Sequence, residues 1–148
     1  KNIELVKNKL EKNKIKIIKS SKNYESFSWP DSKKPKFINV VLKIETIYTP
    51  DELFDKCINI ENELGRKRNK KNEPRTCDID IIDYDKKIFK KVKKHLLTIP
   101  HPKMHMRNFV LVPLFEINKT WKHPVKKVSV KELINRLKIK DLKAIKLI

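Results

Sequence analysis

Apolar and polar positions along the chain recur with the periods of helices and of strands. Near the N-terminus, Ile3, Val6 and Leu10 are three and four positions apart, which is the spacing of one face of an amphipathic helix. From this spacing and from capping residues, the predicted helices are 2–13, 50–64, about 105–116 and about 129–138. From β-branched or alternating residues, the predicted strands are 14–20, 37–46, 77–84, 96–99 and 142–148. This order of helices and strands predicts an α+β fold.

The helix over 50–64 has the clearest ends. Thr49 is a suitable N-cap, Pro50 suits the first helical position, and Glu52 completes a capping box. Gly65, the only glycine in the chain, follows the last apolar position, where helices commonly end in a left-handed residue. We therefore expect this helix to end immediately before Gly65.

Two polar segments are predicted loops. Residues 21–36 contain two prolines with several Ser and Asn, and the aromatic residues among them, Tyr24, Phe27 and Trp29, are predicted to be exposed. Residues 66–76 are polar apart from one proline, and lie directly before a predicted strand.

Composition limits the possible functions. The chain has 148 residues, with 37 Lys and Arg against 18 Asp and Glu, and a formal net charge of +19. Its lysines are spread over the whole length, as solvent-exposed lysines usually are, so the charge alone does not indicate a nucleic-acid partner. A single glycine excludes the glycine-rich loops that cradle nucleotide phosphates, because those loops need several residues with φ above zero. A nucleotide would therefore be held by side chains.

Length and residue usage predict one globular domain over 1–148 without a membrane span. Cys57 and Cys77 form no CxxC pair and are too few for a disulfide framework, which is typical of the reducing cytoplasm. We therefore expect a cytoplasmic protein.

Asp78 and Asp80 are two positions apart in a predicted apolar strand, so both carboxylates leave the same face, about 7 Å apart at the backbone. Two acids so placed repel each other unless a cation neutralises them, and a hard divalent ion with phosphate co-ligands is the usual solution. The alternative is a strand side that is acidic and simply faces solvent. Because the chain has few acids and basic residues lie just upstream, we favour the metal site.

The arginines support this interpretation. Only five of the 37 cationic residues are Arg, whose planar guanidinium binds phosphate through two parallel hydrogen bonds. Arg66, Arg68 and Arg75 precede the acidic strand and Arg107 follows it, whereas Arg136 lies apart on the last predicted helix. Arginines beside metal-binding acids predict phosphoryl transfer.

Three further residues could contact a ligand. His101 stands between two prolines, four residues before His105, and no cysteine or acid at ligand spacing accompanies them, so a phosphate contact is favoured over zinc. Asn39, near the start of a predicted strand, is either a structural bracket or an amide that reads the edge of a heterocycle.

Four segments together resemble the 6-hydroxymethyl-7,8-dihydropterin pyrophosphokinase family, whose members act in folate biosynthesis. These segments are 61–68 (ENELGRKR), 74–81 (PRTCDIDI), 100–102 (PHP) and 107–114 (RNFVLVPL). The resemblance covers nearly the whole chain. It implies a ferredoxin-like α+β fold with an antiparallel sheet, and an enzyme that moves a diphosphate group from ATP to the hydroxymethyl oxygen of the pterin and releases AMP.

The resemblance also implies roles for individual residues. Asp78 and Asp80 would bind two Mg²⁺ ions, and the catalytic residues would be Arg66, Arg75 and Asp80. The ATP-binding residues would be Arg68, Ile81, Thr98, His101 and Arg107. The pterin-binding residues would be Ser26, Phe27, Trp29, Phe37, Asn39 and Phe109.

The chain departs from the family at three places. The family's first strand, central in the sheet and ending in a Gly-Ser-Asn turn, is missing, so we expect a chain that is truncated or incompletely observed at its N-terminus. Asn72 and Glu73 stand where many members have a tryptophan, and Leu96 stands where they have an arginine. These two replacements concern ATP contacts and the loop over 66–76, and leave the metal ligands in place.

Two other functions use some of the same features. A DxD nucleotidyltransferase would use the acid pair but release diphosphate, and no upstream Gly-Ser pair supports it. A basic RNA-binding ferredoxin-like module would need aromatic residues interleaved with basic ones on a strand, whereas the strand over 77–84 contains three acids. We therefore expect a monomeric enzyme of ATP and a pterin, with no specific nucleic-acid or membrane partner.

Overall fold

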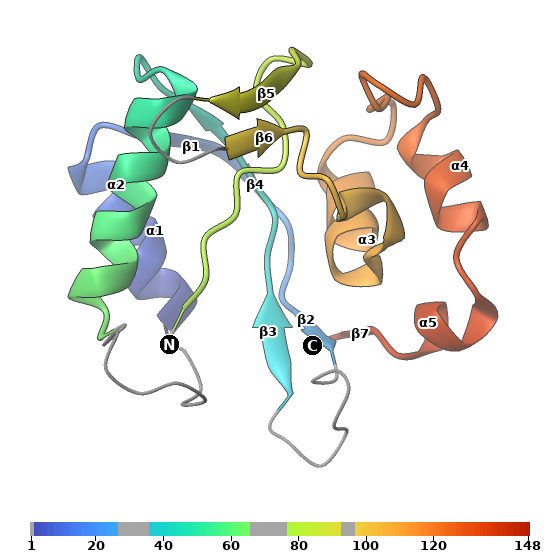
Figure 1. Ribbon diagram of the computed structural model, residues 1–148. Coiled ribbons are helices and arrows are strands. Elements are labelled where there is room, and N and C mark those ends of the chain that lie inside the picture. Colours follow the sequence, from blue (N-terminus) through green and yellow to red (C-terminus); the bar gives the residue numbers. More distant parts are fainter. Residues whose placement is uncertain (1, 27–35, 66–76, 93–96) are drawn as a thin grey trace. The chain divides into compact units, whose positions relative to one another are not determined.

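The computed structural model describes residues 2–26, 36–65, 77–92 and 97–148, and they divide between two compact units (Figure 1). The first unit comprises residues 1–17 and 44–101, and the second comprises residues 18–43 and 102–148. Helices and antiparallel strand pairs occur together, which confirms the predicted α+β class. None of the helices in the described ranges combines the length and the hydropathy needed to cross a bilayer.

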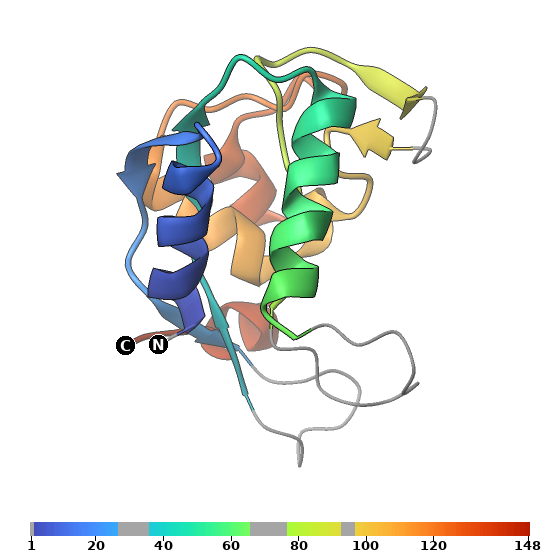
Figure 2. The ribbon, with the colours of Figure 1, turned by 90° about the vertical axis from the view of Figure 1, so that its left-hand side faces the viewer.

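The first unit contains two helices. Helix α1 (Asn2–Lys12) and helix α2 (Pro50–Glu63) lie side by side (Figure 2), and Lys9 Nζ is 2.6 Å from Glu63 Oε2 where they meet. Apolar side chains pack between them and the segments that follow them. The core residues of this unit include Leu10, Ile15, Leu53, Cys57, Ile60, Ile81 and Ile99, all buried.

The ends of α2 are as predicted. Thr49 Oγ1 accepts a hydrogen bond from the backbone N–H of Glu52 at 3.3 Å, and the Glu52 carboxylate accepts one from Thr49 N–H at 3.2 Å. This reciprocal pair is a capping box, with Pro50 at the start of the helix. Gly65 has a φ of 96°, and its N–H donates to Asn62 O, so the last turn closes through the one residue type that adopts this φ without steric cost.

Strands β5 (Phe89–Val92) and β6 (Leu97–Ile99) pair antiparallel and complete the first unit. In the turn before them, Asp85 and Lys86 both adopt positive φ. Strand β6 confirms the strand predicted over 96–99.

The strand predicted over 77–84 is not present as a strand. The backbone there is extended, and its side chains alternate as expected, with Ile81 buried and Asp78 and Asp80 exposed. No strand within the described ranges pairs with it, and a strand is defined by its ladder partner as much as by its own sequence. Its backbone carbonyls accept hydrogen bonds from His101 N–H, at Ile82 O, and from Lys87 N–H, at Tyr84 O, both at 3.0 Å.

The second unit contains a three-stranded sheet and short helices. Strand β2 (Tyr24–Ser26) lies between β3 (Phe37–Asn39) and β7 (Lys146–Leu147), antiparallel to both (Figure 1). The other elements are the 3₁₀ turn η2 (Met104–Met106) and helices α3 (Asn108–Ile117), α4 (Val130–Asn135) and α5 (Ile139–Lys143). Helix α3 contacts β2, β3 and α4, and its Leu111 is fully buried.

Three predictions for the second unit were wrong in part. The predicted loop 21–36 includes β2. Tyr24, which was predicted to be exposed, is buried, and its hydroxyl donates to the Glu116 carboxylate on α3. The helix predicted from about residue 105 begins at Asn108, after η2. The last segment, 142–148, begins within α5 and is a strand only at Lys146–Leu147.

The strand predicted over 37–46 is two strands. Strand β3 pairs with β2, whereas β4 (Leu42–Glu45) pairs with β1 (Lys16–Ser20). Between β3 and β4, Val41 N–H donates to Ser21 Oγ at 3.0 Å and Val41 O accepts from Ser21 N–H at 2.9 Å. The chain therefore changes pairing partner at this point while its backbone remains hydrogen bonded.

Candidate functional site

Two exposed carboxylates alternate with covered apolar side chains after α2. Asp78 and Asp80 are exposed, Cys77 and Ile79 are half-buried, and Ile81 is 8% exposed. In an extended backbone, side chains two positions apart lie on the same side about 7 Å apart, so both carboxylates face solvent together. The apolar side chains anchor the segment, and the two carboxylates lie on its exposed side.

Among the described residues, Asp78 and Asp80 do not belong to a larger cluster of metal ligands. No group of three or more His, Cys, Asp or Glu side chains able to hold a metal occurs among them. Mg²⁺ is usually held by one or two carboxylates, with water and phosphate oxygens as its other ligands.

The two thiols near this segment remain protonated. Burial, then the negative charge of Glu61, raises the pKa of Cys57 to about 12, and smaller contributions come from Cys77 and Asp80. Burial and Glu61 likewise raise the pKa of Cys77 to about 11, with a further contribution from Asp78. A thiol is a nucleophile or a metal ligand as the thiolate, so these cysteines leave an all-oxygen site that suits a hard cation.

Two more of the predicted side chains, Thr98 and His101, belong to the first unit. Thr98 lies on β6, and His101 is joined to the acidic segment by the bond from its N–H to Ile82 O. The first unit therefore contains five of the predicted site residues that the structure describes: Asp78, Asp80, Ile81, Thr98 and His101.

In the second unit, the pairing of β2 with β3 positions Asn39. Its Nδ2 donates to Ser26 Oγ at 2.8 Å and lies 3.4 Å from Tyr24 O. Because the bonds of this amide among the described residues use Nδ2, Oδ1 can accept from a ring N–H of a ligand. Phe37, paired with Ser26 across the strands, is 52% exposed and presents an aromatic surface on the same strand.

Arg107 and Phe109 lie together at the start of α3. The guanidinium carbon of Arg107 is 5.4 Å from the centroid of the Phe109 ring, within cation–π range. Arg107 is also the N-cap of α3, and its carbonyl accepts from the N–H groups of Val110 and Leu111. A positive charge held on an aromatic ring at a helix N-terminus is suited to a planar anionic ligand.

The second unit thus contains the other five described site residues: Ser26, Phe37, Asn39, Arg107 and Phe109. Five predicted residues, Phe27, Trp29, Arg66, Arg68 and Arg75, lie outside the described residues, as do Asn72, Glu73 and Leu96.

One positioning residue was missed in the sequence. Glu116 accepts from the Tyr24 hydroxyl at 2.6 Å and from Lys22 N–H at 2.9 Å, which fixes β2 against α3. Strand β2 also contains Ser26, the partner of Asn39. The one signal for it was that Glu116 is the only charged residue in an otherwise apolar helix.

Comparison with known proteins agrees with the family resemblance seen in the sequence. Residues 1–119 match a sequence model of the 7,8-dihydro-6-hydroxymethylpterin-pyrophosphokinase family. Among similar proteins are 2-amino-4-hydroxy-6-hydroxymethyldihydropteridine pyrophosphokinases from Aquifex aeolicus, 38% identical over 118 residues, and from Haemophilus influenzae, 43% identical over 101 residues. The folic acid synthesis protein fol1 of Pneumocystis carinii is 36% identical over 131 residues.

The extent of these matches differs between the proteins. They cover 80%, 68% and 88% of this chain, and 72%, 61% and 17% of the Aquifex, Haemophilus and Pneumocystis proteins, respectively. The chain thus spans less than a fifth of the length of the fungal protein. Since the family match covers well over half of this chain and includes Asp78 and Asp80, the chain belongs to the 7,8-dihydro-6-hydroxymethylpterin-pyrophosphokinase family, which has an α+β ferredoxin-like fold.

Proposed function

We propose that this chain transfers the terminal diphosphate group of ATP to 6-hydroxymethyl-7,8-dihydropterin, as a step of folate biosynthesis. The hydroxymethyl oxygen attacks the β-phosphorus of ATP, the bond from that phosphorus to the α-phosphate oxygen breaks, and AMP leaves. The observation that carries the proposal is the exposed pair of Asp78 and Asp80, in a chain of this family. The names of its relatives support the choice of substrate.

The acid pair fits a magnesium site. Asp78 and Asp80 supply exposed oxygen ligands, and the nearby thiols of Cys57 and Cys77 are protonated, so the donor set suits Mg²⁺ better than a soft metal. We propose that the pair holds two Mg²⁺ ions together with the ATP phosphates. When bound, Mg²⁺ would neutralise the phosphate charge that develops during transfer.

The other predicted site residues then have distinct tasks. Asp80 accepts the proton of the hydroxymethyl group as its oxygen attacks. His101 and Arg107 bind ATP phosphates, with Thr98 and Ile81 near the nucleotide. The arginines of the segment 66–76, Arg66, Arg68 and Arg75, stabilise the charge on the triphosphate and exclude water from it.

The pterin would be bound by residues of the second unit. Asn39 Oδ1 accepts from a ring N–H, while Nδ2 remains bonded to Ser26 and holds the amide in one orientation. Phe37 and Phe109 provide aromatic walls on which the planar ring stacks. Ser26 with Phe27 and Trp29 would line the same pocket.

The remaining parts of the proposal concern the surroundings of the enzyme. We propose that it works as a monomer in the cytoplasm on these two small molecules. Its positive charge is spread along the sequence and lacks the basic-aromatic pattern of a nucleic-acid-binding strand.

Product analysis tests the function directly. Purified chain is incubated with ATP, MgCl₂ and 6-hydroxymethyl-7,8-dihydropterin, and nucleotides and pterins are separated by HPLC. We expect AMP and the pterin diphosphate to form in equal amounts, and no AMP without the pterin. Release of free diphosphate would instead indicate a nucleotidyltransferase, and release of ADP would indicate a monophosphate kinase.

Replacing Asn39 by Ala is expected to weaken pterin binding selectively. The change removes the amide that accepts from the ring, and loss of one or two such bonds corresponds to about a 10- to 100-fold higher KM for the pterin. The KM for ATP should remain within about twofold. Asn23→Ala is the matched control, because Asn23 is exposed one position before β2. An equal rise of both KM values in Asn39→Ala would indicate that Asn39 is a structural bracket.

A further inference from the structure

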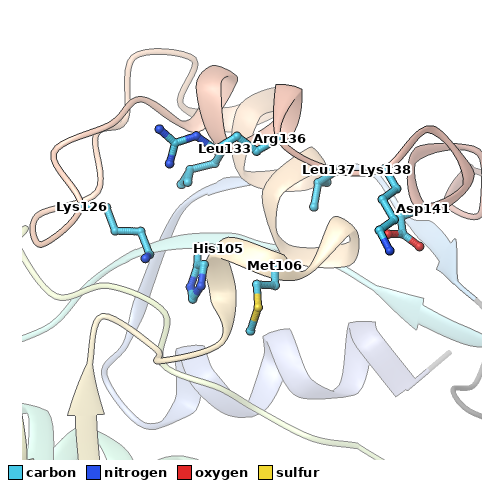
Figure 3. A pocket seen from close by; sticks show the side chains of 8 residues that line it. All are labelled: His105, Met106, Lys126, Leu133, Arg136, Leu137, Lys138 and Asp141. Atoms are coloured by element: carbon cyan, nitrogen blue, oxygen red, sulfur yellow. The ribbon is translucent and has the colours of Figure 1, made fainter.

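A cavity of about 260 Å³ lies within the second unit, and none of the proposed site residues lines it (Figure 3). Its apolar lining is Met106, Leu133 and Leu137. Its polar lining is His105, Lys126, Arg136, Lys138 and Asp141. Four of these five polar residues can carry a positive charge, and none of the four has a task in the proposed reaction.

The charges around the cavity favour an anion. The lining has three positive charges, on Lys126, Arg136 and Lys138, and the single carboxylate of Asp141. When Glu132, which is paired with Arg136, is also counted, the positive charges exceed the negative ones by one. In Figure 3 the amino group of Lys126 points toward the His105 ring, and Lys138 and Asp141 lie at the opposite end of the cavity. Burial, together with the charge of Lys126, lowers the pKa of His105, so its imidazole is neutral at neutral pH and can donate one hydrogen bond.

Arg136 can bind a ligand while it remains paired with Glu132. Its Nε lies 3.7 Å from Glu132 Oε1, in an exposed pair one helical turn apart. Exposed pairs of this kind contribute little to stability, and this one leaves the terminal N–H groups of the guanidinium for another acceptor. Those groups form the fork that binds a phosphate through two hydrogen bonds.

The fold fixes the backbone around the cavity. The buried side chain of His123 accepts hydrogen bonds at Nδ1 from the N–H groups of Val125 and Lys126, at 3.1 and 3.0 Å. At the other end, Asn108 Nδ2 donates to the carbonyl of Asp141. The segments that carry Lys126 and Asp141 are therefore held in place by residues outside the cavity, as is expected of a preformed site.

We propose that this cavity is a binding site for a small molecule that carries a phosphate group and an apolar part. The phosphate lies between Lys126 and Arg136 with His105 as a donor, and the apolar part lies on Met106 and Leu137. None of the lining residues has a task in the proposed reaction, so this proposal does not rest on the proposed function.

NMR titration of the full chain tests the proposal. Inorganic phosphate, sulfate and phenyl phosphate are added at constant ionic strength and pH 7, and the ring signals of His105, assigned with a His105→Gln variant, are followed. We expect saturable shifts of these signals and a higher pKa of His105 in the bound state, because the anion offsets the charge of Lys126. Phenyl phosphate should bind about tenfold more tightly than inorganic phosphate, since it also covers apolar surface. Equal binding would identify free phosphate as the ligand and would contradict the proposed apolar part of the ligand.

Charge-neutralising variants separate a built site from general attraction. Lys126→Gln and Arg136→Gln should each weaken phenyl phosphate binding about tenfold or more, and AMP formation should be unchanged. Lys131→Gln is the matched control, because Lys131 is exposed on α4 but does not line the cavity. Equal weakening in all three variants would mean attraction by the overall charge, and absence of a saturable His105 shift would also overturn the proposal.

Discussion

Replacing Asp80 by Asn is expected to lower the rate of AMP formation about a thousandfold or more, and Asp78→Asn should act similarly. Either change removes one of the two carboxylates proposed to hold Mg²⁺, and Asp80→Asn also removes the proposed proton acceptor. A loss of about 4 kcal/mol of charge stabilisation corresponds to this factor, since about 1.4 kcal/mol is tenfold in rate. The measurement is the initial rate of AMP release at saturating ATP and pterin, over a range of MgCl₂ concentrations.

The same variants should remain folded. Both side chains are exposed, so no apolar contact is lost and no buried charge is left without a partner. Asp85→Asn is the matched control, because Asp85 is exposed in the turn before β5 and its removal changes the net charge equally. If either Asp78→Asn or Asp80→Asn kept more than about a tenth of the activity, the metal assignment would be wrong.

The first helices could be predicted because their signals are local. The capping box of Thr49 and Glu52 and the positive φ of Gly65 involve residues within a few positions of each other, and both are present as expected. The apolar face that begins with Ile3 similarly gives α1 from sequence spacing alone. Such features need no knowledge of which distant segment lies opposite.

The strands were harder to predict because pairing depends on distant residues. Nothing near Tyr24 in the sequence indicates that Glu116, 92 positions later, buries its hydroxyl. The division of the segment 37–46 between two partners is set by Ser21, and the alternation over 77–84 was correct although no described strand pairs there. Side-chain alternation reports which face is covered, whereas a strand also requires a neighbour.

The candidate site shows the same limit. The type and spacing of Asp78 and Asp80 predicted a metal site on one face of the segment, and both side chains are exposed. The metal site itself stays a prediction. The bond from Asn39 to Ser26 depends on the register of β2 with β3, which the sequence did not give. The cavity beside Arg136 was likewise invisible, because its lining comes from four separate stretches of the second unit.

Replacing Glu116 by Ala is expected to lower the free energy of unfolding by about 2 to 4 kcal/mol. The carboxylate accepts from the Tyr24 hydroxyl at 2.6 Å and from Lys22 N–H at 2.9 Å, and its removal leaves the buried hydroxyl without this acceptor. Urea unfolding followed by the fluorescence of Trp121, which is buried in the same unit, measures the loss. Glu132→Ala is the comparison, because it breaks only the exposed pair with Arg136 and should cost less than about 1 kcal/mol.

The pH dependence of stability gives a second measure of the same contact. Burial, then the hydrogen bond and charge of Glu116, raises the pKa of Tyr24 from 10.0 to about 12. The folded state therefore holds the phenol proton more tightly than the unfolded state. This contribution is complete below pH 10 and is lost as the pH rises toward 12. In Tyr24→Phe, which has no phenol to titrate, we expect a smaller loss of stability over this interval than in the unchanged chain. Since the other titratable groups are the same in both proteins, the difference between the two curves isolates Tyr24. Identical curves would show that the pKa of Tyr24 is not raised in the folded state.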